Sequence, residues 1–240
     1  MLIKFNSVYF IPDKFKLLSS EENRYILNDI SFYIKDVMSA IVGRSGSGKS
    51  TIARMILGEI LPNRGTVEIN PEGKRVSVVF QNSLNLLNPY RTGISQLRDV
   101  NKVFNNEGNF NSGFDYLVER LGITAQIMEK KAGELSGGQR QRLAICRQLL
   151  FKPDLLVLDE PFAAQDAFYK ERLSTVLKDY CGSNKIQLIC ISHELQYLTN
   201  LCEYFIVVEN GRIADEGDIA IIKKNPRSEI SKELLKNLSL

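Results

Sequence analysis

The chain has 240 residues, of which 44% are apolar and 25% are charged, and its formal net charge is +3. The length suits one large α/β domain, the composition is that of a packed globular protein, and the charge alone does not indicate a nucleic-acid partner. No run of 18 apolar residues occurs, and the N-terminus "MLIKFNSVYF" lacks the features of a secretory signal, so neither a transmembrane helix nor a signal peptide is expected.

Residues 1 to 82 are expected to form an antiparallel β layer that leads into a phosphate-binding core. Residues 39 to 42 form a short apolar run typical of a strand, and residues 50 to 57 have helical character. Between them, Gly43-x4-Gly48-Lys49-Ser50 fits the phosphate-loop pattern. A Gly/Ser-rich turn is the simpler interpretation, but the strand, loop and helix context favours nucleotide binding, with Lys49 on the β and γ phosphates and Ser50 on Mg²⁺.

The next strand is expected in "VSVVFQ", which places Gln81 at its end, where an amide can contact water or Mg²⁺. Residues 83 to about 151 carry no strong strand signal and should form a mainly helical lobe. Within it, "NKVFNNEGNFNSG" is expected to be an Asn/Gly-rich loop. The lobe ends with "ELSGGQRQRLAICRQLL", a helix whose start consists of Ser136, Gly137 and Gly138 and contains no acid, base or metal ligand.

From residue 152 to residue 217, strands and helices are expected to alternate as in a doubly wound sheet. In "PDLLVLDEPF" an apolar run typical of a buried parallel strand ends at Asp159 and Glu160, acids suited to holding Mg²⁺ and to activating water. A third strand, "IQLICISHE", ends near His193, the only histidine of the chain. A solvated Asp-Glu pair and a histidine with a structural role are the simpler interpretations. The position of these residues at strand ends, together with the phosphate loop, favours a role in phosphate binding or catalysis.

The C-terminal part and the cysteines complete the pattern. "ENGRIADEG" predicts a hairpin with Asn210 and Gly211 as its turn, and the tail from residue 218 predicts two short helices broken at Asn225 and Pro226. The cysteines form no CxxC pair, so we expect no zinc site but reduced, mostly buried thiols, as in a cytosolic protein. The cysteines are Cys146, Cys181, Cys190 and Cys202.

Taken together, these residues resemble the ATPase subunit of ABC transporters over nearly the whole chain. The matching motifs are the phosphate loop "GRSGSGKST", the Gln loop at Gln81, the signature "LSGGQRQR", the Walker B strand "LLVLDEP" and the switch histidine His193. The resemblance implies an α/β fold, namely a P-loop NTPase core of ABC type with an antiparallel β layer and a helical signature lobe. It implies one domain over 1–240, with the core and β layer in 1–82 and 152–217, the signature subdomain in 83–151 and C-terminal helices in 218–240.

The resemblance also implies ATP and Mg²⁺ as cofactors and assigns residues to them. Glu160 would polarise the attacking water, and His193 and Gln81 would complete the catalytic set. Mg²⁺ would be bound by Ser50, Gln81 and, through water, Asp159. The residues expected to contact ATP are Gly43, Ser45, Gly46, Gly48, Lys49, Ser50, Thr51, Ser136, Gly138 and Asp166.

In that family two subunits pack head to tail, and the signature of one covers the γ-phosphate bound by the other. This would explain the bare helix start, because backbone N–H groups and Ser136 bind an anion and glycine permits close approach. Two features depart from the family. The D-loop reads Ala163-Ala164-Gln165-Asp166 instead of Ser-Ala-Leu-Asp, which removes one hydroxyl from the dimer contact. The aromatic that stacks on adenine has three candidates: Phe10, Phe15 and Tyr25.

Within the family, "VFQNSLNLLNPYRT" and the tail "NPRSEISKELLKNL" are similar to segments of the peptide/nickel importers, although residues 228 to 231 replace His-Pro-Tyr-Thr. This implies uptake of nickel, metal chelates or peptides, at the cytoplasmic face of the membrane as a peripheral subunit. The implied partners are transmembrane permease subunits, a second ATPase chain that is different or identical, and an extracytoplasmic substrate-binding protein, with no nucleic acid. The alternatives are an ABC exporter subunit and a non-transport ABC ATPase acting on nucleic acid or ribosomes, for which the sequence lacks coiled coils, zinc cysteines and a second ATPase domain.

Overall fold

The computed structural model describes residues 1–12, 25–35, 38–70, 75–80, 86–105, 112–163 and 165–236. The chain divides into two compact units. The first unit combines Met1–Lys74 with Gln187–Leu240, and the second unit is Arg75–Ile186. Both contain strands and helices, which confirms the predicted α/β class.

The first unit contains a three-stranded antiparallel sheet in the order β2-β1-β4. Buried and exposed residues alternate along much of β2, as expected for a sheet with one face on the core. Phe5 and Phe32 lie opposite each other in the register, and their rings stack with centroids 4.5 Å apart. This sheet is the predicted antiparallel β layer. Its strands are β1 (Leu2–Phe10), β2 (Leu27–Lys35) and β4 (Arg64–Asn70).

A second group of strands in the first unit follows the order β7-β3-β8-β9. Strands β7 and β8 are parallel to β3, whereas β9 is antiparallel to β8. Asn210 and Gly211 join β8 to β9 with φ angles of +49° and +73°, the left-handed conformation that the two-residue hairpin requires. The predicted hairpin is confirmed. These strands are β3 (Ser39–Val42), β7 (Gln187–Ile191), β8 (Tyr204–Glu209) and β9 (Arg212–Asp218).

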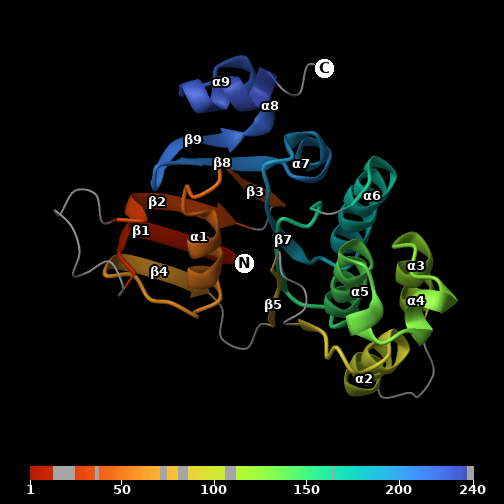
Figure 1. Ribbon diagram of the computed structural model, residues 1–240. Coiled ribbons are helices and arrows are strands. Elements are labelled where there is room, and N and C mark those ends of the chain that lie inside the picture. Colours follow the sequence, from red (N-terminus) through yellow and green to blue (C-terminus); the bar gives the residue numbers. More distant parts are fainter. Residues whose placement is uncertain are drawn as a thin grey trace. The chain divides into compact units, whose positions relative to one another are not determined.

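Four helices of the first unit are described, and two of them form the C-terminal tail. The tail helices are separated at Asn225 and Pro226, as predicted, because proline removes a backbone donor and restricts the preceding residue. Figure 1 shows both beside β9, and contacts join α8 to β9 and α9 to β8 and β9. The helices are α1 (Lys49–Ile56), α7 (Leu195–Leu201), α8 (Ile219–Lys224) and α9 (Glu229–Lys236).

The second unit contains a parallel strand pair and the helical signature lobe. Strands β5 (Val76–Val79) and β6 (Leu155–Asp159) run parallel, and all of β6 is buried, as its continuous apolar run predicts. The helices are α2 (Gly93–Asn105), α3 (Ser112–Arg120), α4 (Ala125–Glu129), α5 (Gly137–Leu150) and α6 (Ala167–Ser183), with a 3₁₀ turn, η4, at Ala132–Glu134.

One prediction in the second unit was wrong at both ends. Residues 101 to 105 were expected to begin the Asn/Gly-rich loop, but they form the last turn of α2, and Ser112 and Gly113, which were expected to end the loop, begin α3. Leu97 and Val100 are buried on α2, which packs against α5. These buried residues stabilise the helix, and its last turn continues past them over Lys102 and Val103, which are exposed.

The four cysteines are free and buried, as predicted. Burial raises the pKa of the Cys146 thiol well above its usual value, so this group stays protonated at neutral pH. Across the described parts of the chain, no helix has both the length and the hydropathy that crossing a membrane requires.

Candidate functional site

The segment between β3 and α1 forms the predicted phosphate loop. Gly43 and Gly48 have φ angles of +152° and +105°. A Cβ on Gly43 would lie 2.1 Å from the carbonyl oxygen of Val208, and a Cβ on Gly48 would lie 2.6 Å from Cδ2 of Leu27. Neither position can hold a side chain without moving its neighbours, so the loop lies directly against β8 and β2.

Lys49 is the central cation of this loop. The residue is only 7% exposed, and its Nζ donates hydrogen bonds to the carbonyl oxygens of Gly43 (2.9 Å) and Arg44 (2.8 Å). It opens α1, whose N-cap Gly48 supplies no side-chain hydrogen bond and whose first turn contains no acid. The Oγ of Ser47 is buried and has no hydrogen-bond partner within the described residues. An ammonium, an uncapped helix start and an unused hydroxyl fit a polyphosphate.

The outer side of the loop is open. Ser45, Gly46 and Ser50 are exposed, and Thr51 is half-buried. A Cβ built on Gly46 would meet no atom within 4 Å. A hydroxyl at the start of α1, as on Ser50, is suited to a Mg²⁺ ion that is shared with bound phosphates. The loop residues therefore fit Mg²⁺ with ATP.

The phosphate loop is also joined to the C-terminal tail. The Arg44 guanidinium forms an ion pair with the carboxylate of Glu233 on α9. Hydrogen bonding and the charge of that carboxylate raise the pKa of Arg44 further above its ordinary value. Both side chains are exposed, so the pair contributes little to stability, but it places α9 beside the loop. Sequence reasoning did not identify this contact.

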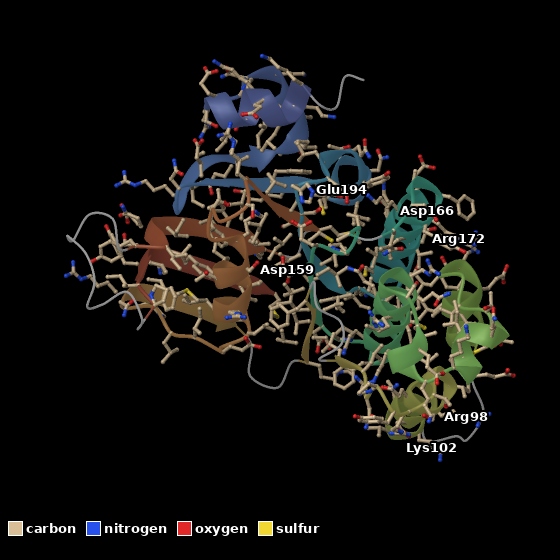
Figure 2. All side chains as sticks on the ribbon, viewed as in Figure 1. Arg98, Lys102, Asp159, Asp166, Arg172 and Glu194 are labelled. Atoms are coloured by element: carbon tan, nitrogen blue, oxygen red, sulfur yellow. The ribbon has the colours of Figure 1, made fainter. Side chains whose placement is uncertain are left out.

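His193 lies at the same sheet edge as the phosphate loop. Strands β7 and β3 are parallel, with Ile191 opposite Ile41, so the carboxyl ends of both strands lie at the same edge of the sheet. Ligands of α/β sheets bind at this edge. His193 is exposed, and the neighbouring Ser192 accepts a hydrogen bond from the Glu194 N–H at 3.1 Å. Figure 2 marks Glu194 at the start of α7.

The three adenine-stacking candidates were Phe10, Phe15 and Tyr25. Phe15 lies outside the described residues, and Phe10 is the last residue of β1. Tyr25 packs edge-on against the ring of Tyr9, with centroids 5.5 Å apart. The next residue, Ile26, has its carbonyl oxygen 3.1 Å from the Cβ position of Gly48. Tyr25 precedes Ile26 in the chain, and the Ile26 N–H donates to the Phe10 carbonyl oxygen at 2.8 Å, so the backbone brings both candidates close to the phosphate loop.

Asp159 and Glu160 stand at the carboxyl end of β6 in the second unit, as predicted, and Figure 2 marks Asp159 there. Asp159 is buried, whereas Glu160 is half-buried. Glu160 has a φ of +52°, which is unfavourable for a residue with a Cβ. Its carbonyl oxygen accepts hydrogen bonds from the Gln141 side chain (2.8 Å) and from the Ala163 N–H (3.2 Å). Such strain is found at functional sites that their surroundings hold in place.

The bare helix start of α5 is partly satisfied by its own side chains. The Ser136 hydroxyl accepts from the Gln139 N–H at 3.3 Å, and the Gln139 side chain accepts from the Ser136 N–H at 3.0 Å. This is a capping box. Ser136 and Gly137 are exposed, whereas Gly138 is buried. The Ser136 hydroxyl oxygen therefore caps the helix, and the hydroxyl hydrogen can still donate a hydrogen bond to an anion.

The D-loop departure has a structural counterpart in the second unit. Asp166, which Figure 2 labels, caps α6, and its Oδ1 accepts from the Tyr169 N–H at 3.0 Å. Gln165 donates to the carbonyl oxygen of Pro161 at 2.9 Å, and its Oε1 is buried without a hydrogen-bond partner in the described chain. Ala164 lies outside the described residues. The glutamine that replaces leucine here thus stabilises the turn after β6.

Two further sets of residues bear on the site. Gln81 lies outside the described residues, so its predicted place at the end of β5 stays a prediction. Among the residues that the structure describes, no group of three or more His, Cys, Asp or Glu side chains forms a metal site.

Sequence reasoning missed Ser47, Gln141 and Glu233. Gln141, the second glutamine of "GGQRQR", could have been identified from the sequence, because it is a polar residue on the otherwise apolar, buried face of this helix.

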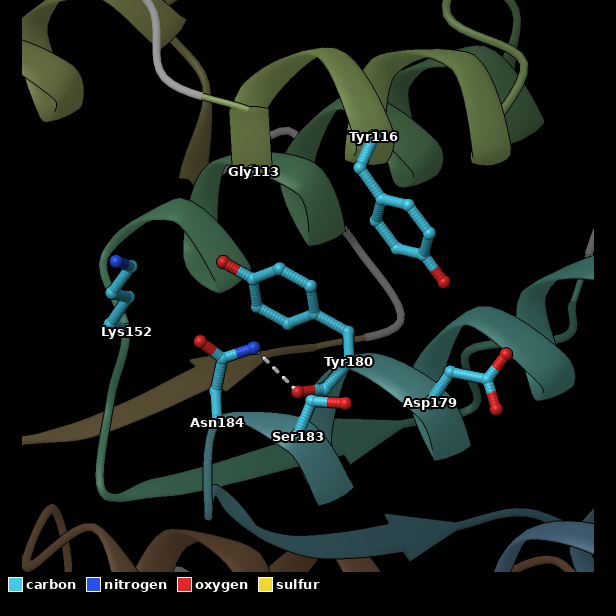
Figure 3. Close-up of a pocket in the computed structure, with 7 residues that line it drawn as sticks. All are labelled: Gly113, Tyr116, Lys152, Asp179, Tyr180, Ser183 and Asn184. Carbon is cyan, nitrogen blue, oxygen red and sulfur yellow. Dashed lines mark hydrogen bonds between the residues drawn. The ribbon is translucent and has the colours of Figure 1, made fainter.

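A pocket of about 420 Å³ in the second unit contains none of the motif residues (Figure 3). The rings of Tyr116 and Tyr180 stack there, with centroids 6.3 Å apart, and burial raises the pKa of Tyr180 to about 12. The Asn184 side chain donates to the Tyr180 carbonyl oxygen at 2.8 Å. Lys152 and Asp179 both line the pocket, so its charges do not favour a polyphosphate. The phosphate-loop, Walker B and signature residues lie elsewhere, and we do not assign the nucleotide to this pocket.

Comparison with known proteins gives a consistent result. A family model described as "ABC transporter" matches residues 27–163. The chain is 29% identical over 231 residues to YejF, an uncharacterized ABC transporter ATP-binding protein of Escherichia coli (strain K12). That match covers 89% of this chain but 44% of YejF, so the chain spans less than half the length of that relative.

Two further relatives match over most of their own length. The thiamine import ATP-binding protein ThiQ of Salmonella choleraesuis (strain SC-B67) is 33% identical over 186 residues, which are 74% of this chain and 78% of ThiQ. The nickel import system ATP-binding protein NikE of Staphylococcus aureus (strain N315) is 30% identical over 222 residues, which are 91% of this chain and 94% of NikE.

The fold matches solved structures as well. The dimeric structure of MJ0796, a bacterial ABC transporter cassette, superposes with a TM-score of 0.74 at 24% identity. The match covers 90% of this chain and 98% of the MJ0796 chain. The fold is therefore that of such a cassette, as the motifs predicted.

Proposed function

Because the chain belongs to the ABC transporter family and is an ATPase of that family, we propose that it is the ATP-hydrolysing subunit of an importer. The observation that carries this proposal is the phosphate loop, where buried Lys49 lies at the uncapped start of α1. That arrangement matches the β and γ phosphates of a nucleotide. Import is supported by NikE and ThiQ, both described as import ATP-binding proteins.

We assign ATP binding to the phosphate loop and the start of α1. Backbone N–H groups would bind the phosphates, Lys49 would bridge the β and γ phosphates, and Phe10 and Tyr25 are the described candidates for the adenine contact. Mg²⁺ would be bound by Ser50, Gln81 and, through water, Asp159, and it neutralises phosphate charge when bound. The ATP-contacting residues of this group are Gly43, Ser45, Gly46, Gly48, Lys49, Ser50 and Thr51.

Hydrolysis needs a group that accepts a proton from the attacking water. We assign this role to Glu160, a half-buried carboxylate that follows β6 in a constrained backbone conformation. His193 would donate a hydrogen bond to the γ-phosphate from the sheet edge beside the phosphate loop, and Gln81 would orient the water. These three residues form the proposed catalytic set.

A second ATPase chain would complete each site. Ser136 and Gly138 begin α5, whose first turn contains no acid, so this helix start is suited to the γ-phosphate held by a partner. Asp166 would lie at the same contact. The D-loop lacks the usual serine, which favours a different chain as the partner over a second copy. The further partners would be transmembrane permease subunits and an extracytoplasmic substrate-binding protein, with this chain peripheral at the cytoplasmic face.

We propose nickel, metal chelates or peptides as the transported class. The support is the likeness to NikE over 91% of this chain, together with the segment after Gln81 and the tail that resemble peptide/nickel importers. ThiQ is 33% identical, which favours thiamine as a second candidate. We further propose that residues 1–240 act as one ATPase domain, with 83–151 as the signature subdomain and 218–240 as C-terminal helices.

The test measures nucleotide binding by the purified full chain, and ATP hydrolysis by the chain reconstituted with its permease and any companion ATPase. Lys49→Ala should abolish ATP binding or hydrolysis, and Glu160→Gln should keep ATP binding while hydrolysis falls about 10²- to 10⁴-fold. Lys185→Ala, an exposed lysine on the loop before β7, is the matched control. Unchanged ATP affinity and rate in Lys49→Ala would refute the proposal. Uptake by the chain reconstituted with its permease, assayed with nickel chelates, dipeptides and thiamine, then decides the substrate class.

A further inference from the structure

Gln141 is a buried polar residue one turn into α5. It is only 3% exposed, although buried positions on such a helix are normally apolar. Its side-chain Nε2 donates a hydrogen bond of 2.8 Å to the backbone carbonyl oxygen of Glu160. The two residues are 19 positions apart in the sequence and belong to the same unit. The bond therefore connects the signature helix to the residue that follows β6.

The carbonyl that Gln141 contacts belongs to a strained residue. Glu160 has a φ of +52°, and its carbonyl oxygen also accepts the N–H of Ala163 at 3.2 Å. Two donors on one carbonyl fix the peptide plane after Glu160 and so limit its backbone rotation. The backbone conformation in turn sets the direction in which the Glu160 side chain leaves the strand.

We propose that Gln141 is a positioning residue, which holds Glu160 in its left-handed conformation and so keeps its carboxylate aligned with the attacking water. This proposal rests on the proposed role of Glu160 as the base. It also links the position of the base to the orientation of α5, whose N-cap Ser136 lies five positions before Gln141. A helix start that contacts a partner's nucleotide would then influence hydrolysis in this chain's own site.

The first test removes the donor while keeping the volume. In the full chain reconstituted with its permease and any companion ATPase, Gln141→Met should lower kcat about 10- to 100-fold, because small misplacements of a catalytic group have effects of that size. The KM for ATP should stay within about twofold, because the phosphate loop is unchanged. Gln148→Met, half-buried on the same helix, is the matched control and should keep the parent rate.

The second test is a pH profile, which a purely structural role would not alter. In Gln141→Glu, a protonated carboxyl can donate to the Glu160 carbonyl, whereas a carboxylate repels it, and burial raises the pKa of such a carboxyl. The rate of this variant relative to the parent should rise as the pH falls from about 8.5 to about 6, since the donor returns on protonation. The Gln141→Met ratio should stay flat.

Glu160→Gln in the same assay separates the two proposals. If Glu160→Gln keeps the parent rate, the base assignment itself is wrong and the proposed function fails at that point. If Glu160→Gln is inactive but Gln141→Met keeps its kcat within twofold, Gln141 has no positioning role. A loss in Gln141→Met without any pH recovery in Gln141→Glu would mean that the glutamine only supports folding, which also overturns the inference.

Discussion

The guanidinium of Arg142 lies 3.8 Å from the centroid of the Tyr169 ring and so joins α5 to α6. Arg142 is only 7% exposed, and burial lowers the pKa of its guanidinium below the ordinary value. The backbone N–H of Tyr169 donates to Asp166, which caps α6. One tyrosine thus connects the signature helix to the residues that begin α6.

Tyr169→Leu should lower the free energy of unfolding by about 2 to 4 kcal/mol, because it removes a desolvated cation–π contact and part of a packed ring. A cavity would open beside Gly122, whose Cβ position lies 2.8 Å from the Tyr169 ring. Urea unfolding measures the change. Tyr169→Phe keeps the ring and should stay within about 0.5 kcal/mol of the parent. Equal losses in both variants would contradict this role of the ring.

Gly43→Ala tests whether the phosphate loop is pressed against β8. The new Cβ would clash with the Val208 carbonyl, 2.1 Å away, so we expect a loss of about 3 kcal/mol or more in unfolding free energy. Gly58→Ala is the control, because Gly58 also has a positive φ but open space around it. It should cost only about 1 kcal/mol, from the backbone conformation alone. Similar costs for the two variants would exclude the steric argument.

Gly138→Asp tests the helix start. A carboxylate would meet the γ-phosphate of a partner where a positive helix end is needed, so ATPase activity of the assembled complex should be lost. ATP binding by the isolated chain should persist, because the phosphate loop is untouched. Gly138→Ala adds bulk without charge and should retain at least about tenfold more activity, as expected for an electrostatic effect. Full activity of Gly138→Asp in the complex would refute the signature assignment.

Glu216 on β9 provides a pH-dependent test of stability. Its Oε2 is buried without a partner in the described residues, and burial raises the pKa of this carboxyl, with Asp215 adding to the shift and Arg227 opposing it. A carboxyl with a raised folded-state pKa stabilises the fold when protonated, and that contribution is lost as the pH rises through the interval above the unfolded value.

Glu216→Gln should therefore gain stability over the parent as the pH increases from about 4 to about 8, because the variant does not ionise. Chemical unfolding at several pH values measures this difference. A difference that stays constant across the range would show that Glu216 keeps its unfolded-state pKa in the folded protein.

The sequence by itself determined the features that local physics controls. Asn210 and Gly211 predict the hairpin because a two-residue turn needs left-handed residues, and Pro226 ends a helix through its missing donor. The glycine and lysine spacing of the phosphate loop and the apolar run of β6 are similarly local. Each of these patterns depends only on residues that are close together in the sequence, so each can be read without knowing the tertiary structure. Together they indicate the family, the fold and the candidate site.

Tertiary structure alone decided the contacts between distant residues. Gln141 meets the Glu160 carbonyl across 19 positions, and Arg44 meets Glu233 across 189 positions. Helix α2 continues through Asn105, against the preference of asparagine for a loop, and its buried residues Leu97 and Val100 belong to the helix that packs against α5. The sequence shows which interactions each side chain can make. Which partner the side chain finds depends on how helices and strands pack, and that packing minimises the free energy of the whole unit.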